Sequence, residues 1–250
     1  MKDKETLKKI EDAVRECAQI ILHAKRNEEM VDEKSGRANF VTTYDKAVQE
    51  ALREKLMAIV PDAVFVGEEE DIHASIKTGD AFIVDPIDGT TNFIKDYRAS
   101  SISVGMTRDG SQLLGVIYNP YLDEMFSALK GYGAYLNGKR IHVSDEPLSN
   151  GIILFGTAPY YEELSKRSFE MAYEYFKQGL DIRRSGSAAI DLCSIAAGRA
   201  ELFFELRLSP WDYAAGSLIV TEAGGKVTTV EGEEINLGAP CSVLATNGRC

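Results

Sequence analysis

The densest group of residues that could do chemistry is the segment VDPIDGTTNF at 84–93. Two carboxylates, Asp85 and Asp88, follow an apolar run that predicts a buried strand, and Pro86 holds the turn between them. The four residues after Asp88 predict the first turn of a helix or a tight nest, whose free backbone N–H groups can bind phosphate oxygens. Because two acids beside an anion would repel it, this combination predicts a hard divalent cation such as Mg²⁺ between carboxylates and phosphate.

Three further carboxylates stand in a similar position, directly after a strand-like run. Glu68 and Glu69 follow the run AVFVG at 63–67, and Asp212 follows a second apolar run and opens a helical segment. Each acid alone is explained equally well as a helix cap or a solvated turn residue. Strand ends converge in open α/β sheets, where ligand sites usually form, so acids at several strand ends predict one shared site.

The patterns of several other enzyme classes are absent from the sequence. Aspartyl-phosphate phosphatases of the haloacid dehalogenase type use D-x-D-G-T, but the residue two before Asp88 is Pro86, so their nucleophile is missing. The motifs G-x-S-x-G, G-x-x-x-x-G-K-[ST], G-x-G-x-x-G and H-E-x-x-H do not occur either. The sequence therefore offers no recognisable nucleophile for a covalent protein intermediate.

The composition is that of an acidic globular protein. The 250 residues include 28 Lys and Arg against 39 Asp and Glu, a net charge of −11, so we expect no nucleic-acid partner. No window approaches 18 apolar residues and the N-terminus lacks the apolar run of a signal peptide, so we expect no membrane span and a cytoplasmic protein. The four cysteines form no C-x-x-C pair and are predicted to be reduced thiols: Cys17, Cys193, Cys241 and Cys250.

Apolar periodicity in the first half of the chain indicates helices followed by short strands. Steps of three and four residues predict a helix over about 3–28, and a second helix begins at 43 or 44 and ends at 59. A buried strand is predicted over 81–86, and Pro86 is expected to end it. Residues 101–145 predict a meander of strands.

The second half alternates between strands and helices, which is typical of an α/β arrangement. Gly198 is placed to end one of these helices. No linker, repeat or low-complexity segment separates the halves. We therefore predict one compact unit over 1–250, with an N-terminal α+β half at 1–146 and a C-terminal α/β half at 147–250.

Three motifs in a fixed order resemble those of the inositol monophosphatase family: G-E-E at 67–69, D-P-I-D-G-T-T-N-F at 85–93 and W-D-Y-A-A-G at 211–216. The likeness covers nearly the whole chain. Members are Mg²⁺-dependent, lithium-sensitive sugar-phosphate phosphatases and are often dimeric. The resemblance therefore implies a layered α-β-α-β-α sandwich of the inositol monophosphatase/fructose-1,6-bisphosphatase type, and we expect a homodimer.

The resemblance also implies roles for individual residues. The metal would be held by four carboxylates and one backbone carbonyl: Glu68, Asp85, Asp88, Asp212 and the carbonyl of Ile87. The phosphate would be held by Gly89, Thr90 and Thr91. Thr90 would orient the attacking water with the help of Asp45. Glu69 would belong to the catalytic site without contacting the metal directly. The remaining substrate would meet Asp88, Ala188, Glu205 and Asp212.

The implied reaction is hydrolysis of a phosphate monoester of a small polyol, foremost myo-inositol monophosphate, by a water activated by two or three Mg²⁺ ions. Relatives with the same chemistry remain open: fructose-1,6-bisphosphatase, adenosine 3′,5′-bisphosphate phosphatase and histidinol phosphatase. Arg183 and Arg184 could meet a second phosphate, whereas Glu205 favours a polyol. A different alternative is a non-catalytic interaction scaffold, which loss of a metal ligand or of Thr90 would mark.

Overall fold

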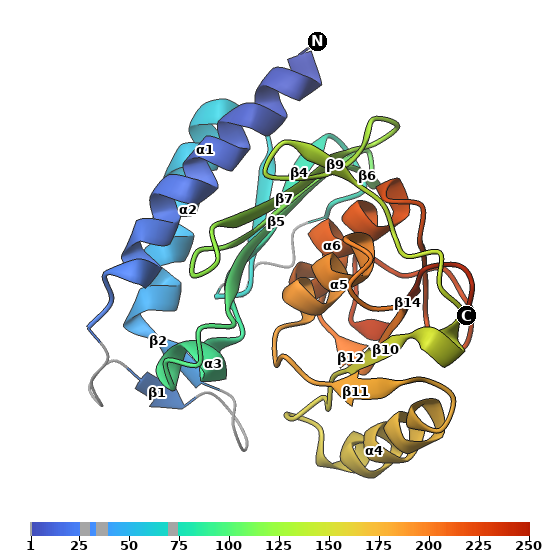
Figure 1. The fold of residues 1–250 in the computed structure, drawn as a ribbon. Coiled ribbons are helices and arrows are strands. Elements are labelled where there is room, and N and C mark those ends of the chain that lie inside the picture. Colours follow the sequence, from blue (N-terminus) through green and yellow to red (C-terminus); the bar gives the residue numbers. More distant parts are fainter. Residues whose placement is uncertain (1, 26–30, 34–39, 70–74) are drawn as a thin grey trace.

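The protein is built from two mixed β-sheets with helices between them and on both outer sides (Figure 1). A computed structural model describes residues 2–25, 31–33, 40–69 and 75–250. The layers run from a helix pair through a seven-stranded sheet, a second helix pair and a five-stranded sheet to a last helix. This order confirms the predicted α-β-α-β-α sandwich.

The first half of the chain forms the seven-stranded sheet. In spatial order its strands are β3 (Val64–Gly67), β4 (Asp80–Asp88), β5 (Ser101–Arg108), β6 (Ser111–Asn119), β7 (Glu124–Leu129), β8 (Gly133–Leu136) and β9 (Lys139–Ile141). Only the β3–β4 pair among them is parallel. Helices α1 (Lys2–Leu22) and α2 (Thr43–Ile59) cover its outer face. The short strands β1 (Val31–Glu33) and β2 (Phe40–Thr42) pair separately.

The second half forms the five-stranded sheet and the remaining helices. In spatial order its strands are β11 (Asp181–Arg183), β10 (Ile152–Phe155), β12 (Leu202–Leu208), β14 (Cys241–Thr246) and β13 (Lys226–Thr228). Helices α5 (Ala188–Ala196) and α6 (Pro210–Glu222) lie between the two sheets, and α4 (Glu162–Phe176) lies outside. A short 3₁₀ turn, η2 (Leu148–Asn150), precedes β10, in the region where the sequence predicts the boundary between halves. The division into two halves of one unit stays a prediction.

Two predicted boundaries in the first half are wrong. Helix α1 ends at Leu22 rather than near 28, although 26–30 lie outside the described residues. Pro86 does not end its strand, because β4 continues to Asp88. The register against β5 shifts between Asp85 and Asp88, so β4 has one extra residue there and forms a bulge. Pro86 lies in this bulge, where a residue without an N–H interrupts no hydrogen bond between the strands.

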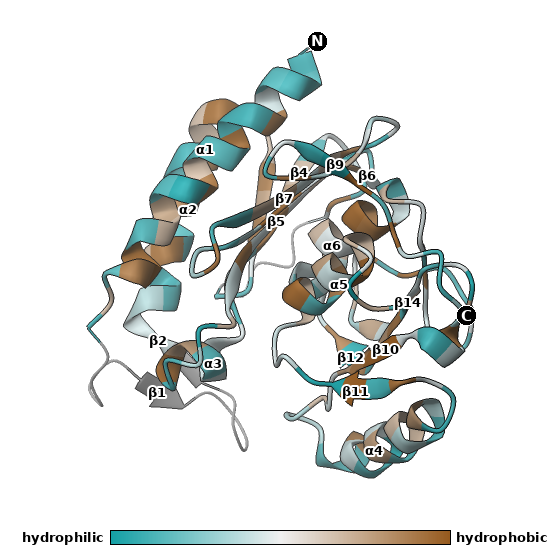
Figure 2. Ribbon diagram, viewed as in Figure 1, coloured by the Kyte–Doolittle hydropathy of each residue, from teal (hydrophilic) through white to brown (hydrophobic). Residues whose placement is uncertain are grey.

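Hydrophobic residues are concentrated at the interfaces between the layers. The helices between the sheets carry brown and white residues in Figure 2, whereas the visible side of α1 is largely teal. Helix α5 ends at Ala196, and Gly198 follows its C-cap as predicted. The positive φ of Gly198, 67°, allows a Schellman turn that is closed by a bond from the N–H of Arg199 to the carbonyl of Ser194. Within the described part of the chain, no helix combines the length and apolar character needed to cross a membrane.

A glycine pair lets α6 approach the seven-stranded sheet closely. Gly105 on β5 and Gly115 on β6 lie opposite each other in the sheet. A Cβ on Gly115 would lie 2.7 Å from the carbonyl oxygen of Ala215, and one on Gly105 would lie 3.0 Å from the Cβ of Ala214. The start of α6, which carries Asp212, is thereby held against the end of the sheet where β4 finishes.

We therefore predict that Gly115→Ala lowers the free energy of unfolding by about 1–3 kcal/mol, because the extra methyl group overpacks a backbone contact. Urea unfolding followed by circular dichroism measures the change. Gly238→Ala is the control, because among the described residues its added Cβ would meet only the Asn236 side chain, at 3.4 Å. Equal stability of Gly115→Ala and the wild type would refute the close-packing role of this glycine.

Candidate metal and phosphate site

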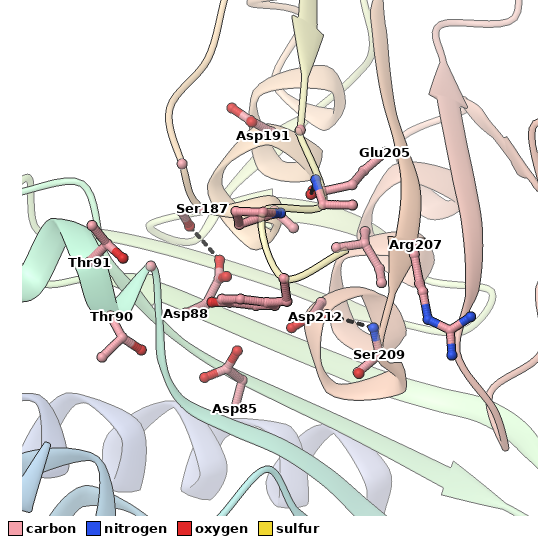
Figure 3. Close-up of a pocket in the computed structure, with 18 of the residues that line it drawn as sticks. Asp85, Asp88, Thr90, Thr91, Ser187, Asp191, Glu205, Arg207, Ser209 and Asp212 are labelled. Atoms are coloured by element: carbon pink, nitrogen blue, oxygen red, sulfur yellow. Dashed lines mark hydrogen bonds between the residues drawn. The ribbon is translucent and has the colours of Figure 1, made fainter. Parts of the chain in front are cut away.

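A cavity of about 440 Å³ lies where the ends of β4 and β12 meet the first turns of α3 (Thr90–Ile94), α5 and α6 (Figure 3). It receives residues from both halves of the chain. Ten of the residues predicted for the site line it: Glu68, Asp85, Ile87, Asp88, Gly89, Thr90, Thr91, Ala188, Glu205 and Asp212. Parts of the chain far apart in sequence therefore meet at one place, as the position of acids at strand ends predicts.

Three carboxylates form a tight cluster within this cavity. Oxygens of Asp85, Asp88 and Asp212 all lie within 4.8 Å of one another. The bulge in β4 separates Asp85 from Asp88, and Asp85 Oδ1 accepts a bond of 3.0 Å from the N–H of Ile87. Asp212 is the third residue of α6, and its Oδ2 accepts a bond of 2.6 Å from the N–H of Ser209, which precedes the helix.

The electrostatics of the cluster are unfavourable in the absence of a cation. Burial raises the pKa of Asp85 well above its usual value, and the charges of Glu68, Asp88 and Asp212 raise it further. Burial also raises the pKa of Asp212 well above its usual value, with Asp88 and Glu68 as further causes. Burial and repulsion between like charges both disfavour the ionised carboxylates, and a bound divalent cation would offset both effects.

Asp88 is anchored to the second half of the chain. Its Oδ2 accepts hydrogen bonds from the hydroxyl of Ser187 and, at 2.8 Å, from the N–H of Ala189 at the start of α5. Burial raises the pKa of Asp88 to about 6, although the Ser187 and Ala189 bonds act in the opposite direction. Ser187 also caps α5 by accepting a bond from Ile190, so one hydroxyl fixes both the helix and the carboxylate.

Thr90 and Asp45 lie together beside the acid cluster. The Thr90 hydroxyl lies 3.3 Å from Asp45 Oδ1 and 3.1 Å from the carbonyl oxygen of Ile87. Asp45 is fully buried, and its Oδ2 accepts a bond from the N–H of Thr42 in the capping box of α2. Gly89 has a φ of 87°, and a Cβ there would lie 3.0 Å from the carbonyl oxygen of Ala99. Glycine is therefore required at the turn into α3.

Glu205 is neither at the end of a strand nor solvated. It lies within β12 and its side chain is 7% exposed. Its Oε1 accepts a bond of 2.8 Å from the N–H of Ala158, in the loop that forms another wall of the cavity. Burial raises the pKa of Glu205 to about 7.

Two predicted residues lie behind the cavity rather than in it. Asp45 contacts Thr90 and its charge contributes to the raised pKa of Asp85, whereas Glu69 is not among the described residues that line the cavity. The N–H of Glu69 donates instead to Oε1 of Gln49 on α2, at 3.0 Å. Arg184 lines the cavity, whereas Arg183 forms an ion pair with Asp181.

Several residues that line the cavity have no role predicted from the sequence, among them five with polar side chains. Nothing in the local sequence pattern around these five residues indicates a role in a site. They are Tyr160, Ser187, Asp191, Arg207 and Ser209. Arg207 lines the cavity from the same strand as Glu205, although the register of β12 against β14 shifts between Glu205 and Leu208. The Arg207 guanidinium lies 4.7 Å from the centre of the Tyr161 ring.

The comparison with known proteins agrees with this geometry. A model of the inositol monophosphatase family matches residues 2–249. The chain belongs to the inositol monophosphatase family. It is 38% identical over 244 residues to inositol monophosphatase 2 of Solanum lycopersicum, covering 94% of this chain and 91% of that protein.

A second relative carries a different name. The chain is 35% identical over 222 residues to Nus factor SuhB of Pasteurella multocida, covering 88% of this chain and 83% of the relative. The solved structure of the inositol monophosphatase from Anabaena (Nostoc) sp. PCC 7120 superposes with a TM-score of 0.87 at 30% identity, covering 100% of this chain and 93% of the other. Family membership and fold are thereby shown, whereas the roles of single residues stay predictions.

The acid cluster of this inositol monophosphatase family member fits Mg²⁺. Its donors are carboxylate oxygens, which this hard cation prefers, and three of them lie close enough to share an ion. The carbonyl of Ile87 and the carboxylate of Glu68 line the same cavity and could complete the ligand set. The residues present therefore suit the metal that the family uses.

The raised pKa values predict how the stability of the metal-free protein depends on pH. Asp88 and Glu205 have ordinary pKa values of 3.8 and 4.5, which folding raises to about 6 and about 7. Folding is therefore favoured by their protonation. This contribution is complete below the ordinary values and is lost as the pH rises through the folded values.

In excess chelator, the melting temperature should fall between pH 5 and pH 8, and it should fall less steeply in Glu205→Gln, which has no titrating group at this position. Differential scanning fluorimetry in a constant-ionic-strength buffer measures both slopes. Parallel slopes for the wild type and Glu205→Gln would show that Glu205 titrates normally.

Proposed function

We propose that this protein hydrolyses the phosphate monoester of a small polyol, with myo-inositol monophosphate as its substrate. The observation that carries the proposal is the cluster of Asp85, Asp88 and Asp212 within 4.8 Å of one another, beside the turn that opens α3. Family membership supports a metal-dependent phosphomonoesterase, and the substrate is the finer part of the proposal.

The acidic residues would hold the metal and the substrate phosphate together. Glu68, Asp85, Asp88, Asp212 and the carbonyl of Ile87 would hold two or three Mg²⁺ ions, which when bound neutralise the phosphate dianion and lower the pKa of a coordinated water. The backbone N–H groups of Gly89, Thr90 and Thr91 lie at the start of α3 and would bind phosphate oxygens. The carboxylates that would hold Mg²⁺ and the N–H groups that would bind the phosphate therefore lie in one cavity.

Thr90 and Asp45 would orient the attacking water. The hydroxyl hydrogen of Thr90 has two acceptors, Asp45 Oδ1 and the Ile87 carbonyl, so the lone pairs of the hydroxyl oxygen remain for a water hydrogen. Asp45 is buried and held by the capping box, so this arrangement is preorganised. The water proton would pass to Thr90 Oγ1 as the Thr90 proton moves to Asp45. Glu69 would have only a supporting role.

The other side of the cavity would recognise the polyol. Glu205 and Ala188 line it together with Asp88, and each carboxylate can accept hydrogen bonds from substrate hydroxyls. Arg184 and Arg207 line the same cavity and favour a second candidate, a sugar bisphosphate such as fructose 1,6-bisphosphate, whose second phosphate they would bind. The adenosine 3′,5′-bisphosphate and histidinol phosphate reactions have no comparable support.

A non-catalytic interaction scaffold is the alternative of a different class, and one relative is named as a Nus factor and not as a phosphatase. It is disfavoured here because every predicted metal ligand is present and lines the cavity. A homodimer and a cytoplasmic location remain part of the proposal, as does sensitivity to lithium.

The function is tested by phosphate release from a panel of inositol, fructose, histidinol and nucleotide monoesters and bisphosphates, with Mg²⁺ and in excess chelator. We expect myo-inositol monophosphate to give the highest kcat/KM and chelator to abolish activity. Higher kcat/KM for fructose 1,6-bisphosphate would favour the second candidate. Full activity in chelator, or none on any ester, would reject a metal-dependent phosphatase.

Asp212→Asn should lower kcat/KM by about 100-fold or more, because a charge stabilisation of several kcal/mol is lost. The fold should persist, since the amide oxygen of Asn can still accept the bond from Ser209. Steady-state kinetics and circular dichroism measure the two effects. The control is Asp145→Asn, which removes the same charge from a side chain that is 95% exposed. Comparable activity of the two variants would contradict the metal role of Asp212.

Glu205→Gln should lower kcat/KM for the polyol phosphate by roughly 10- to 150-fold, the range of a hydrogen bond to a charged group. It should leave a simple aryl phosphate nearly unaffected, because that substrate lacks the hydroxyls. The Gln oxygen can still accept from Ala158, so the loop is retained.

Glu201→Gln is the matched control for this substitution. Glu201 is also buried and accepts a backbone bond, from Ile152 at 2.6 Å, but it is not among the described residues that line the cavity. Equal losses on both substrates, or no loss on either, would remove Glu205 from polyol recognition.

A further inference from the structure

Gln49 on α2 is a buried polar residue without a part in the proposed reaction. Its side chain is 5% exposed and lies one helical turn after Asp45, on the same face of α2. Asp45 contacts Thr90, and Gln49 Oε1 accepts the N–H of Glu69 at 3.0 Å. Two successive turns of one helix thus reach two different segments of the site.

The bond from Gln49 fixes the backbone around Glu68. The N–H of Glu68 donates to the carbonyl oxygen of Val84 on β4 at 3.1 Å, and the next N–H, that of Glu69, donates to Gln49. Both peptide groups that flank the Cα of Glu68 are therefore held. Because the two peptide planes determine the direction of the Cα–Cβ bond, they also determine where the Glu68 side chain enters the cavity.

Gly67 makes room for this arrangement. A Cβ on Gly67 would overlap the amide group of Gln49 and lie 2.9 Å from the Phe65 ring. The backbone of Gly67 has no positive φ, so the absence of a side chain here serves the close approach of Gln49. The glycine of the G-E-E motif and the glutamine on α2 therefore form one packing unit.

We propose that Gln49 is a positioning residue that sets the affinity of the site for Mg²⁺ by directing Glu68 into the cavity. The inference rests on the proposed metal-dependent function. Removal of a group that orients a metal ligand through a hydrogen bond commonly weakens metal affinity by about 10- to 100-fold. Gln49 is not among the described residues that line the cavity, and its bond to the N–H of Glu69 connects it to the backbone that carries Glu68.

The test is Gln49→Met, which keeps the length and helix propensity of the side chain but removes the acceptor. Isothermal titration of the metal-stripped protein with MgCl₂ should give a dissociation constant about tenfold or more above that of the wild type. At saturating Mg²⁺, kcat should stay within about threefold, because the reacting groups are unchanged. Gly67→Ala, which displaces the amide without changing residue 49, should weaken Mg²⁺ binding in the same direction.

Two further variants separate positioning from general damage. Gln49→Glu keeps an acceptor and should bind Mg²⁺ within about threefold of the wild type. Leu52→Ala removes a fully buried side chain from the same helix, so it should lower the melting temperature without changing Mg²⁺ affinity. Unchanged Mg²⁺ affinity in both Gln49→Met and Gly67→Ala, or an equal loss in Leu52→Ala, would overturn the inference. Absence of Mg²⁺ binding by the wild type would instead reject the proposed function itself.

Discussion

Repulsion between carboxylates is the constraint on which this structure depends. Asp85, Asp88 and Asp212 are held within 4.8 Å of one another in a place where water stabilises them poorly. An arrangement of this kind persists only if the surrounding structure holds each group more firmly than repulsion drives it apart. The bulge in β4, the caps of two helices and the close packing of α6 supply that resistance. A bound divalent cation would offset the repulsion, so the same three carboxylates would form a cation-binding site.

Several side chains in this protein both cap a helix and contribute to the site. Asp212 uses one carboxylate oxygen for the cap of α6, which leaves the second oxygen for the acid cluster. Asp45 divides its oxygens in the same way, between Thr42 and Thr90. Ser187 caps α5 while it donates to Asp88. Capping and function, which a sequence presents as competing explanations, are therefore compatible here, and the caps give the side chains their rigidity.

The site joins the two halves of the chain through polar contacts between their turns. Asp88 accepts from Ser187 and Ala189, and Asn92 donates to the carbonyl oxygens of Ala99 and Ser185. The cavity walls from β4 and α3 are therefore bonded to the start of α5 and the loop before it. A change in the loop before α5 would reach Asp88 directly, so the geometry of the acid cluster depends on the packing of both halves.

Local sequence patterns predicted most of the secondary structure and the acidic residues of the site. Periodicity predicted most helices and strands, and the spacing D-P-x-D-G-T-T, with acids after two other strands, predicted a metal and phosphate site, because both signals are local. The local signal failed at Pro86, because a bulge tolerates a proline within a strand. The burial of Glu205 depends on packing against the loop at Ala158, which no local pattern indicates. No local sequence pattern indicated a role for four other residues: Ser187, Asp191, Arg207 and Gln49. Their positions follow from which turns pack together, and only the tertiary structure decides which side chains meet across contacts this distant in sequence.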